Sequence, residues 1–293
     1  MPLLTIFTPT YNRAHILGRL YESLKRQNCG DFCWLIVDDG SVDNTNDLVK
    51  QWQAENKVSI SYHRQENTGK SQAHNKGVAL TQTELFVCVD SDDYLTCDAV
   101  SEIKDIWKNG RDSDTGILCG KKTENQEVTI FPKKGLLKES RATLRDAYDK
   151  YGLLGDTMLV FRTSTIKRFS FPKFDGEKFV PEAYLYDLID QCGSLIVYDK
   201  YLYVCEYQQD GYTHNMARLL ATNPHGYLAF IRQRISLDSS FTCIFWDTVR
   251  YISMALVLMS TTQSIKNSQY PIIALLALLP GFILYKIKFQ QYA

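Results

Sequence analysis

The chain has 293 residues, with 33 basic and 33 acidic side chains, and it is 45% hydrophobic, 23% charged and 12% aromatic. This length predicts one large domain, or a domain with an appendage, that buries a substantial core. The composition excludes disordered, collagen-like and coiled-coil chains, and a net charge of zero gives no reason to expect nucleic acid as a partner.

The charges are unevenly distributed along the chain. From Met216 onward there are seven basic residues and two acidic ones, a net charge of +5, so the first 215 residues carry −5. An acidic body followed by a basic, apolar tail predicts a soluble catalytic part that associates with an anionic membrane surface.

The cysteines and the N-terminus predict a reduced compartment. Eight cysteines are scattered along the chain, and only Cys29 and Cys33 lie close together. They form no CxxC motif, and no paired histidines accompany them at zinc spacing. Residues 2–8 read as a strand and not as a signal peptide, because they lack a basic segment and a long apolar core.

Strands and helices alternate through the first 100 residues. The predicted strands are residues 3–8, 32–37, 58–62 and 85–89. The predicted helices begin at an Asn12 cap, at Asp43 or Asn44, and at about residue 71. This alternation predicts βαβ units in a parallel sheet, which binds its ligands at the carboxyl ends of the strands.

Acidic side chains follow two of these predicted strands. Asp38 and Asp39 end the second strand, and Asp90, Asp92 and Asp93 end the fourth, so we expect the functional site at this edge of the sheet. The turn after the first strand has no GxGxxG pattern, and no Gly-Lys-Ser/Thr closes a phosphate-binding loop. A DxD alone is a weak signal, because most such pairs lie in surface loops or helix caps.

The second half of the chain is less regular. Residues 117–119 and 157–161 predict strands, and residues 181–189 predict a helix with proline in its first turn. Residues 194–198 and 202–205 predict a β-hairpin around Asp199 and Lys200.

Two apolar helical stretches follow, over residues 249–260 and 267–285. The second stretch is 19 residues without a charge, is interrupted by Pro280-Gly281, and is flanked by Lys266, Lys286 and Lys288. A membrane-spanning helix needs about 20 predominantly apolar residues. The stretch therefore favours a helix lying in the membrane interface, with a buried helix pair and a true span as the alternatives.

Four segments of the first half come in order at fitting separations. They are Thr8-Pro9-Thr10-Tyr11-Asn12-Arg13, Val37-Asp38-Asp39-Gly40-Ser41 with Asp43 and Thr45, Asn67-Thr68-Gly69-Lys70 with Ala73, Asn75 and Gly77, and Val89-Asp90-Ser91-Asp92-Asp93. Together they resemble the family 2 inverting nucleotide-sugar glycosyltransferases, whose fold is called GT-A. The resemblance continues more loosely through residues 171–182 and 206–213, which are similar to bacterial members that build capsular and other surface polysaccharides.

The resemblance implies an α/β fold of the GT-A type, with a mixed, mostly parallel sheet flanked by helices. Residues 1–215 would form the glycosyltransferase domain, with the nucleotide-binding half in residues 1–100 and the acceptor and catalytic-base half in residues 101–215. Residues 216–293 would form a helical, membrane-associating tail.

The resemblance also implies the donor site. Asp92, with Asp90 or Asp93, would hold Mn²⁺ or Mg²⁺ against the diphosphate of a UDP-sugar. The nucleotide-binding residues that it implies are Thr8, Pro9, Tyr11, Arg13, Asp39, Lys70 and Asp90. Asp39 would accept a hydrogen bond from the uracil imide, with Asp38 orienting the loop. A helix cap is the alternative for Asp39, and solvated helix-end charges are the alternative for Arg13 and Lys70.

Inversion by direct displacement requires a base that removes the acceptor hydroxyl proton. In many relatives this base is the Asp of a Glu-Asp pair that opens a helix, and Pro181-Glu182 occupies that place here. Glu182 is the candidate catalytic residue, and Glu177 and Asp187 are its rivals. Among the five histidines, only His214 follows a loop that resembles a donor site.

The implied enzyme is a hexosyltransferase-like glycosyltransferase. It would transfer a sugar from a UDP-sugar to a hydroxyl of a lipid-linked glycan, working in the cytoplasm on the inner face of the bacterial cell membrane. A catalytically silent scaffold and a sugar nucleotidyltransferase are the alternatives, whereas a processive synthase would need several clear membrane spans. The donor sugar, the linkage and the oligomeric state stay open.

Overall fold

The computed structural model describes residues 1–132, 140–206 and 215–292. The chain forms two compact units, Met1–Ser170 with Leu185–Gln208, and Phe171–Tyr184 with Gln209–Ala293. The second unit therefore contains a segment from the middle of the chain besides the C-terminal part. The loop of residues 210–213 and His214, singled out above, lie outside the described residues.

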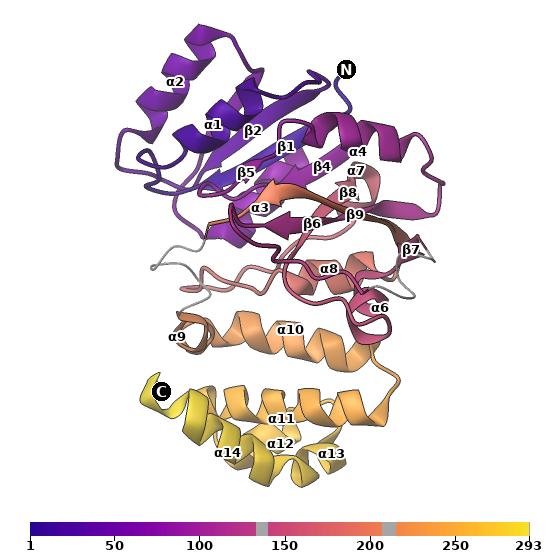
Figure 1. The fold of residues 1–293 in the computed structure, drawn as a ribbon. Helices are drawn as coiled ribbons and strands as arrows, with labels where there is room; N and C mark the ends of the chain where they lie inside the picture. The colour runs from indigo at the N-terminus through magenta and orange to yellow at the C-terminus, as the bar shows by residue number, and fades with distance from the viewer. Residues whose placement is uncertain (133–139, 207–214, 293) are drawn as a thin grey trace. The chain divides into compact units, whose positions relative to one another are not determined.

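The first unit is built on a nine-stranded sheet (Figure 1). Its strands are β1 (Leu4–Thr10), β2 (Phe32–Asp38), β3 (Ile60–Arg64), β4 (Leu85–Cys88), β5 (Tyr94–Leu95), β6 (Asp114–Lys122), β7 (Arg141–Ala142), β8 (Thr157–Arg162) and β9 (Ser194–Val204). Its helices are α1 (Gly18–Lys25), α2 (Thr45–Glu55), α3 (Lys70–Leu80), α4 (Ala99–Trp107), α6 (Leu144–Asp149), α7 (Thr163–Ile166) and α8 (Ala183–Ile189), the last of which begins in the second unit.

The sheet is mixed and mostly parallel. Its strand order is β3-β2-β1-β4-β8-β6-β9-β5, and β7 pairs with β9 off this path. The pairs β1–β2, β1–β4, β2–β3 and β6–β9 are parallel. Only β5, β7 and β8 run against the others. The predicted fold class, an α/β sheet of the GT-A type flanked by helices, is confirmed.

Alternating side chains of the strands form cores on both faces of the sheet. Ile6 and Trp34 belong to a buried cluster with side chains from α1, α2 and α4, including Trp52. On the opposite face, Phe7 packs against Phe86 with ring centroids 5.4 Å apart, and both rings contact His74 of α3 edge-on. The helices thus cover both faces and leave the carboxyl edge of the strands open for loops.

The predicted start of the first helix at Asn12 is wrong. The helix begins at Gly18, and Asn12 has a φ of 53°, in the left-handed region. The Asn12 side chain accepts a hydrogen bond from the Val42 amide at 2.9 Å, so it joins two loops instead of capping a helix. An asparagine tolerates this backbone conformation better than most residues, which explains its place in the turn.

The predicted hairpin around Asp199 and Lys200 is also wrong. Residues Ser194–Val204 form one continuous strand that pairs in parallel with β6, with its register shifted between Leu118 and Gly120. The two polar residues lie in this irregular stretch, where Lys200 pairs with Glu102 at 2.6 Å. A charged pair in mid-strand therefore marks a bulged, solvent-facing segment here and not a turn.

The second unit is helical. Its further helices are α9 (Met216–Ala221), α10 (Pro224–Leu237), α11 (Phe241–Leu258), α12 (Thr261–Lys266), α13 (Pro271–Leu276) and α14 (Leu278–Lys288), followed by the short helix η2 (Gln290–Tyr292). In the described part of the chain, α11 is the one helix long and apolar enough to cross a membrane, judged by length and composition. Within this unit α11 contacts α10, α12, α13 and α14.

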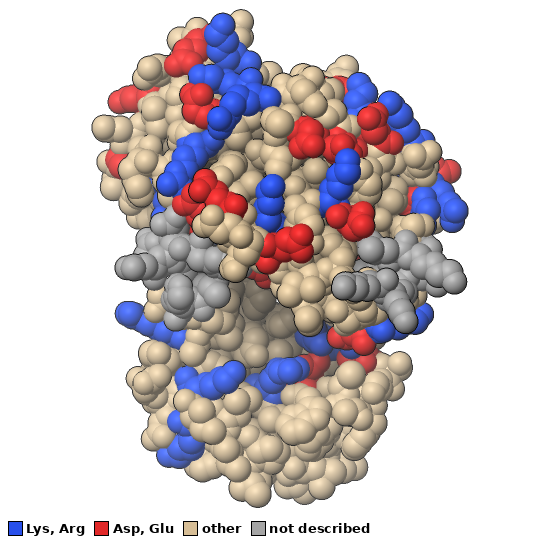
Figure 2. Space-filling view, viewed as in Figure 1, with Lys and Arg blue, Asp and Glu red and all other residues tan. Residues whose placement is uncertain are grey.

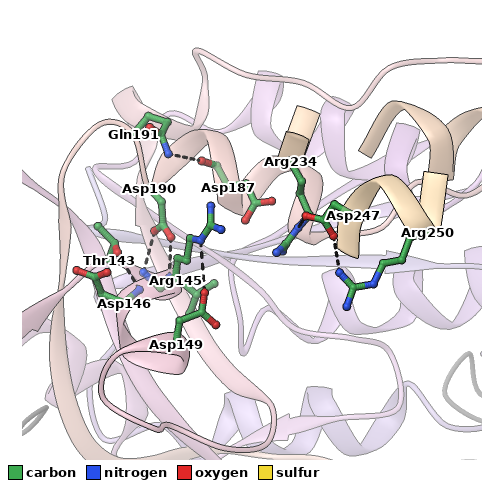
Figure 3. A network of polar contacts seen from close by, with 11 residues as sticks. Thr143, Arg145, Asp146, Asp149, Asp187, Asp190, Gln191, Arg234, Asp247 and Arg250 are labelled. Carbon is green, nitrogen blue, oxygen red and sulfur yellow. Dashed lines mark hydrogen bonds and ion pairs between the residues drawn. The ribbon is translucent and has the colours of Figure 1, made fainter. Parts of the chain in front are cut away.

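The core of the helical unit contains a buried ion-pair cluster. Asp247 of α11 is 1% exposed, and its carboxylate binds Arg234 of α10 at 3.0 Å and Arg250 one turn further along α11 (Figure 3). A buried carboxylate is tolerated only when it is paired, and two guanidinium groups supply that pairing. The cluster fixes α10 on α11.

Candidate active site

Three parallel strands end side by side at the candidate site. Because β1 lies between β2 and β4, the loops that follow these strands are neighbours at the carboxyl edge of the sheet (Figure 1). Asp38 ends β2 opposite Thr10, and residues 90–93 follow β4. The two acidic segments therefore lie at one edge, as the sequence predicted.

The loops after β1 and β2 are held together by reciprocal hydrogen bonds. The Asn12 amide donates to Oγ of Ser41 at 2.9 Å, which complements the bond from the Val42 amide to Asn12. Asp38 accepts the Ser41 amide at 2.7 Å and the Tyr62 hydroxyl at 2.5 Å. Asp38 thus orients the loop, the role that the resemblance suggested for it.

The predicted nucleotide-binding residues of β1 and its loop differ in exposure. Thr8 and Pro9 are buried in the strand, and Oγ1 of Thr8 accepts a hydrogen bond from the Trp34 indole at 3.0 Å. Tyr11 is 45% exposed, and Arg13 is half-buried. With their side chains buried, Thr8 and Pro9 could contact a ligand only through their backbone, whereas the Tyr11 ring is accessible from solvent.

Asp39 anchors the loop that leads into α3. Its buried carboxylate accepts hydrogen bonds from the Gln65 side chain at 2.8 Å and from the amides of Thr68 at 2.9 Å and Gly69 at 2.8 Å. Gly69 has a φ of 93°, which a side chain would disfavour, so the chain turns sharply into the helix there. Oδ2 accepts only the Gly69 amide among these three donors and keeps lone-pair capacity for another.

Lys70 and Asp90 contact each other. Nζ of Lys70, in the first turn of α3, lies 2.7 Å from Oδ1 of Asp90, and both side chains are partly exposed. Lys70 therefore lies beside the acidic segment instead of at an isolated helix end. Two residues that the sequence assigned separately to nucleotide binding are brought together.

Asp92 lies in a crowded electrostatic environment. Burial, followed by the charge of Asp90, raises the pKa of the half-buried Asp92 carboxyl. The charges of Arg13 and Lys70 act in the opposite direction and lower this pKa, so both cations lie near enough to influence Asp92.

Asp93 is buried and already bonded on both oxygens. Its carboxylate accepts the Tyr203 hydroxyl at 2.7 Å and the Glu206 amide at 2.9 Å. Burial, with the charge of Asp90 second, raises the pKa of Asp93 to about 7. The same Tyr203 oxygen accepts the amide of Asp90 at 3.1 Å. Tyr203 thus holds both ends of the acidic turn.

The carboxylates at this edge suit a hard divalent cation whose remaining ligands come from a substrate. Among residues 1–132, 140–206 and 215–292, no three His, Cys, Asp or Glu side chains form a group able to hold a metal ion. Mg²⁺ is usually held by one or two carboxylates together with substrate phosphates, which needs no complete protein cage. A cation there would relieve the repulsion between Asp90 and Asp92, which makes these two carboxylates the candidates to hold it.

The candidate base and its rivals have different surroundings. Glu182 directly precedes α8 and belongs to the second unit. Glu177, in the same unit, accepts the amides of His225 and Gly226 at 2.8 Å each, so it caps the start of α10. Asp187 lies on α8 within the first unit and is half-buried. Glu177 therefore has a structural role that its sequence context did not predict.

Tyr203 was missed by sequence reasoning. The sequence placed it only in the predicted hairpin, yet it is 1% exposed, and its hydroxyl donates to Asp93 and accepts the amide of Asp90. A tyrosine buried in an otherwise apolar strand needs a hydrogen-bond partner for its hydroxyl. That requirement was the available signal, although it does not say which carboxylate meets it.

A family profile decides the classification. The profile described as Glycosyl transferase family 2 matches residues 5–169, which is more than half of the chain. The chain belongs to this family. The matched region contains Asp38, Asp39 and residues 90–93.

Named relatives align over different lengths. A β-1,3-glucosyltransferase of Campylobacter jejuni, named for GalNAc(5)-diNAcBac-PP-undecaprenol, is 25% identical over 252 residues, 83% of this chain and 80% of that protein. The validoxylamine A glucosyltransferase of Streptomyces hygroscopicus is 38% identical over 95 residues, 31% of this chain. That match spans only 22% of the Streptomyces protein, and a match to a Mycobacterium bovis PGL/p-HBAD biosynthesis glycosyltransferase spans 37% of that relative.

Solved structures share the fold of this family 2 chain. S. aureus TarS, residues 1–349, in complex with UDP-GlcNAc, has a TM-score of 0.62 at 17% identity, covering 99% of this chain and 91% of that one. A mannosyltransferase of Pyrobaculum calidifontis in complex with GDP-Man and Mn²⁺ has a TM-score of 0.58 at 16% identity, covering 99% and 83%. Both likenesses support the fold class of this chain.

Proposed function

We propose that this chain transfers a sugar from a UDP-sugar to a hydroxyl of a lipid-linked glycan, with inversion at the anomeric carbon. The reaction belongs to the assembly of a bacterial surface polysaccharide, capsular or exocellular, on the cytoplasmic face of the membrane. In this proposal the chain catalyses the transfer and is not a catalytically silent scaffold that only binds the nucleotide sugar.

One observation carries this proposal. The acidic loops after β2 and β4 lie at one sheet edge, where Lys70 pairs with Asp90 and the charge of Asp90 acts on Asp92. Such an edge attracts a diphosphate bridged by a cation and also offers a cation of its own. Without Lys70 and Arg13, the acidic cluster would suit a metal ion but would offer no positive side chain to a diphosphate.

The donor would be held by residues of three loops. Asp39 would accept the uracil imide N–H on Oδ2, while its other bonds keep the loop before α3 in place. Arg13 and Lys70 would meet the phosphates. Asp92 and Asp90 would hold Mn²⁺ or Mg²⁺, which would supply Lewis-acid stabilisation of the negative charge on the leaving diphosphate.

The displacement needs one proton acceptor. The acceptor hydroxyl oxygen forms a bond to the anomeric carbon as the bond from that carbon to the diphosphate oxygen breaks, and UDP leaves with the electron pair. The hydroxyl proton would pass to the carboxylate of Glu182. Such a base contributes on the order of 10²–10⁴ in rate.

The acceptor class rests on the comparisons and the charge pattern. The Campylobacter jejuni relative, which aligns over most of both chains, is named for an undecaprenol diphosphate glycan. The basic tail of this chain is suited to the anionic membrane surface where such a lipid lies. Both observations support a lipid-linked acceptor.

A donor panel tests the proposal. Purified full chain is incubated with individual UDP- and GDP-sugars in Mn²⁺, Mg²⁺ or EDTA, and release of the nucleoside diphosphate is recorded. We expect slow hydrolysis of one UDP-sugar that EDTA and Asp92→Ala both abolish. Asp105→Ala removes an exposed carboxylate paired with Lys108 on α4, away from the acidic loops, and serves as the matched control.

The outcomes separate the alternatives. Release that persists in EDTA and in Asp92→Ala removes the metal assignment, and failure to bind UDP with or without metal refutes the donor assignment. For the base, Glu182→Gln is expected to retain UDP binding and to lose at least a hundredfold in turnover. Glu22→Gln, at an exposed ion pair of α1, is the control for this change.

A further inference from the structure

The C-terminal helices of the second unit expose their large apolar side chains. Seven residues spaced as one helical stripe along α13 and α14 are 45–79% exposed, and they are Ile272, Leu275, Leu276, Leu279, Phe282, Ile283 and Ile287. A helix on the surface of a water-soluble protein normally turns such residues inward. Figure 2 shows the end of the unit formed by these helices as a largely uncharged surface.

The most deeply buried positions of α13 and α14 are small residues. Ala274 and Ala277 are fully buried, and Gly281 is buried against α11. A Cβ at Gly281 would lie 2.7 Å from Cγ2 of Ile252, so the two helices pack at close range. Ile273, Leu278 and Leu284 are only partly buried, and the larger side chains of the stripe are exposed. The close approach leaves no room for a larger side chain at Gly281.

The charges around the stripe have one sign. After Asp247 the chain contains no acidic residue, whereas Lys266, Lys286 and Lys288 are exposed at the ends of α12 and α14. Nζ of Lys286 lies 5.4 Å from the centroid of the Phe282 ring. Long basic side chains beside an apolar stripe are suited to lipid headgroups, with their stems on the apolar surface.

We propose that the α13–α14 stripe binds the surface of an anionic lipid bilayer. The apolar side chains would enter the interface, and the three lysines would contact anionic headgroups. The inference deepens the proposed function, because a lipid-linked acceptor lies in the same surface. Binding of lipid is nevertheless independent of sugar transfer and is measured without a donor.

The helices lie on the bilayer and do not span it. α13 has 6 residues and α14 has 11, whereas a span needs about 20. The break between them falls at Ala277, and Pro280 is accommodated in the first turn of α14, where a proline costs no helical hydrogen bond. The interruption predicted at Pro280-Gly281 thus lies three residues earlier.

Vesicle co-sedimentation of the full chain tests the proposal. Vesicles of phosphatidylcholine alone and with phosphatidylglycerol are compared at low and high salt. We expect binding to the anionic vesicles that weakens in high salt. Leu275→Gln/Leu279→Gln is expected to reduce partitioning at least tenfold, and Lys286→Gln/Lys288→Gln to reduce binding to anionic vesicles roughly thirtyfold.

Matched variants in the first unit control for general effects. Ile130→Gln/Leu154→Gln replaces two apolar side chains that are 54% and 58% exposed, and Lys50→Gln/Lys108→Gln removes two exposed cations. Thermal unfolding verifies that every variant is folded. We expect the control variants to bind vesicles like the parent chain.

Two results would overturn the proposal. The first is vesicle binding that the leucine variant and its control reduce equally. The second is a parent chain that does not bind vesicles but forms a concentration-dependent dimer, which the leucine variant converts to monomer. The stripe would then be covered by a second copy of the chain. Neither result depends on UDP-sugar turnover, so failure here is distinguishable from failure of the proposed reaction.

Discussion

The hydroxyl of Tyr203 donates a 2.7 Å hydrogen bond to Oδ2 of Asp93, 110 residues earlier in the chain. The same oxygen accepts the amide of Asp90, so one buried side chain of β9 holds the acidic turn that follows β4. The Lys121 ammonium lies 4.2 Å from the centroid of the Tyr203 ring and fixes it further. Because both oxygens of Asp93 already accept hydrogen bonds, we expect Asp92, and not Asp93, to be the metal ligand.

Tyr203→Phe is therefore expected to weaken metal-dependent nucleotide binding. The change leaves a buried carboxylate and a backbone amide each without one partner, which costs about 1–3 kcal/mol of folding stability. A loosened turn also misplaces Asp92, and we expect an approximately tenfold higher Mn²⁺ requirement for UDP binding. Calorimetric titration of UDP at several Mn²⁺ concentrations measures this requirement.

Tyr62→Phe provides a matched control. It removes another tyrosine hydroxyl that donates to a carboxylate, that of Asp38, at the end of a different strand. Its stability should fall by a similar amount while its Mn²⁺ requirement stays unchanged. If both variants lose stability and neither alters the Mn²⁺ dependence, Tyr203 is structural only.

Lys70→Met is expected to separate nucleotide affinity from cation affinity. If the ammonium 2.7 Å from Asp90 meets the phosphates as proposed, its loss should weaken UDP binding about tenfold or more. Because one positive charge beside Asp90 and Asp92 disappears, the divalent cation alone should bind more tightly. Titration with UDP and, separately, with Mn²⁺ checks both directions.

Lys50→Met is the control, since this exposed lysine of α2 is paired only loosely with Asp47 at 3.9 Å. Equal losses of UDP affinity in the two variants would indicate a general effect of net charge. Unchanged UDP affinity in Lys70→Met would restrict Lys70 to balancing the charge of Asp90.

The carboxyl of Asp190 should make the stability of the folded chain depend on pH. Burial raises its pKa to about 6, although its carboxylate accepts the amides of Leu144 at 2.9 Å and Arg145 at 2.8 Å (Figure 3). Since the folded chain holds this proton more tightly than the unfolded chain, the stabilisation is present at low pH and is lost as pH rises through about 6.

The parent chain should lose about 1 kcal/mol relative to Asp190→Asn between pH 5 and pH 7. Urea unfolding of both proteins at several pH values gives this difference directly. Asp149→Asn, at an exposed carboxylate of α6, should track the parent chain. A difference that stays constant with pH would show that Asp190 titrates normally.

Sequence patterns within single strands and the loops that follow them predicted the acidic edge of the site. Apolar runs ending in acids placed Asp38, Asp39 and residues 90–93 at one sheet edge, because parallel strands share the direction of their carboxyl ends. The contacts of Asp93 could not be predicted in this way. They depend on the pairing of β9 with β5 and β6, which places Tyr203 opposite Leu95 and Lys121.

The failed predictions share a physical cause. Asn12 reads as a helix cap, and Asp199-Lys200 reads as a turn, when each is judged by its neighbours in sequence. In the fold, Asn12 bonds the loop after β2, and Lys200 pairs with Glu102 of α4. Tertiary partners outweighed local preference at both places.

Gly77 shows how closely α3 packs on the sheet. A Cβ added there would collide with the ring of Phe7 in β1, and Phe7 in turn stacks on Phe86 of β4. Neither ring has room to move, because both belong to the buried layer between α3 and the strands. Gly77→Ala is therefore expected to destabilise the fold by about 1–3 kcal/mol through overpacking.

Gly18→Ala tests the opposite case on α1. An added Cβ at Gly18 meets no atom within 4 Å, so this change should be neutral or should stabilise the helix by about 0.5–1 kcal/mol. Urea midpoints of the two variants measure both effects. Since β1 carries Phe7 only a few residues before the loop of Tyr11 and Arg13, Gly77→Ala should also weaken UDP binding. Equal midpoints for the two alanine variants would show that α3 shifts to make room, and the close packing of helix and strand would then not hold the nucleotide loop in place.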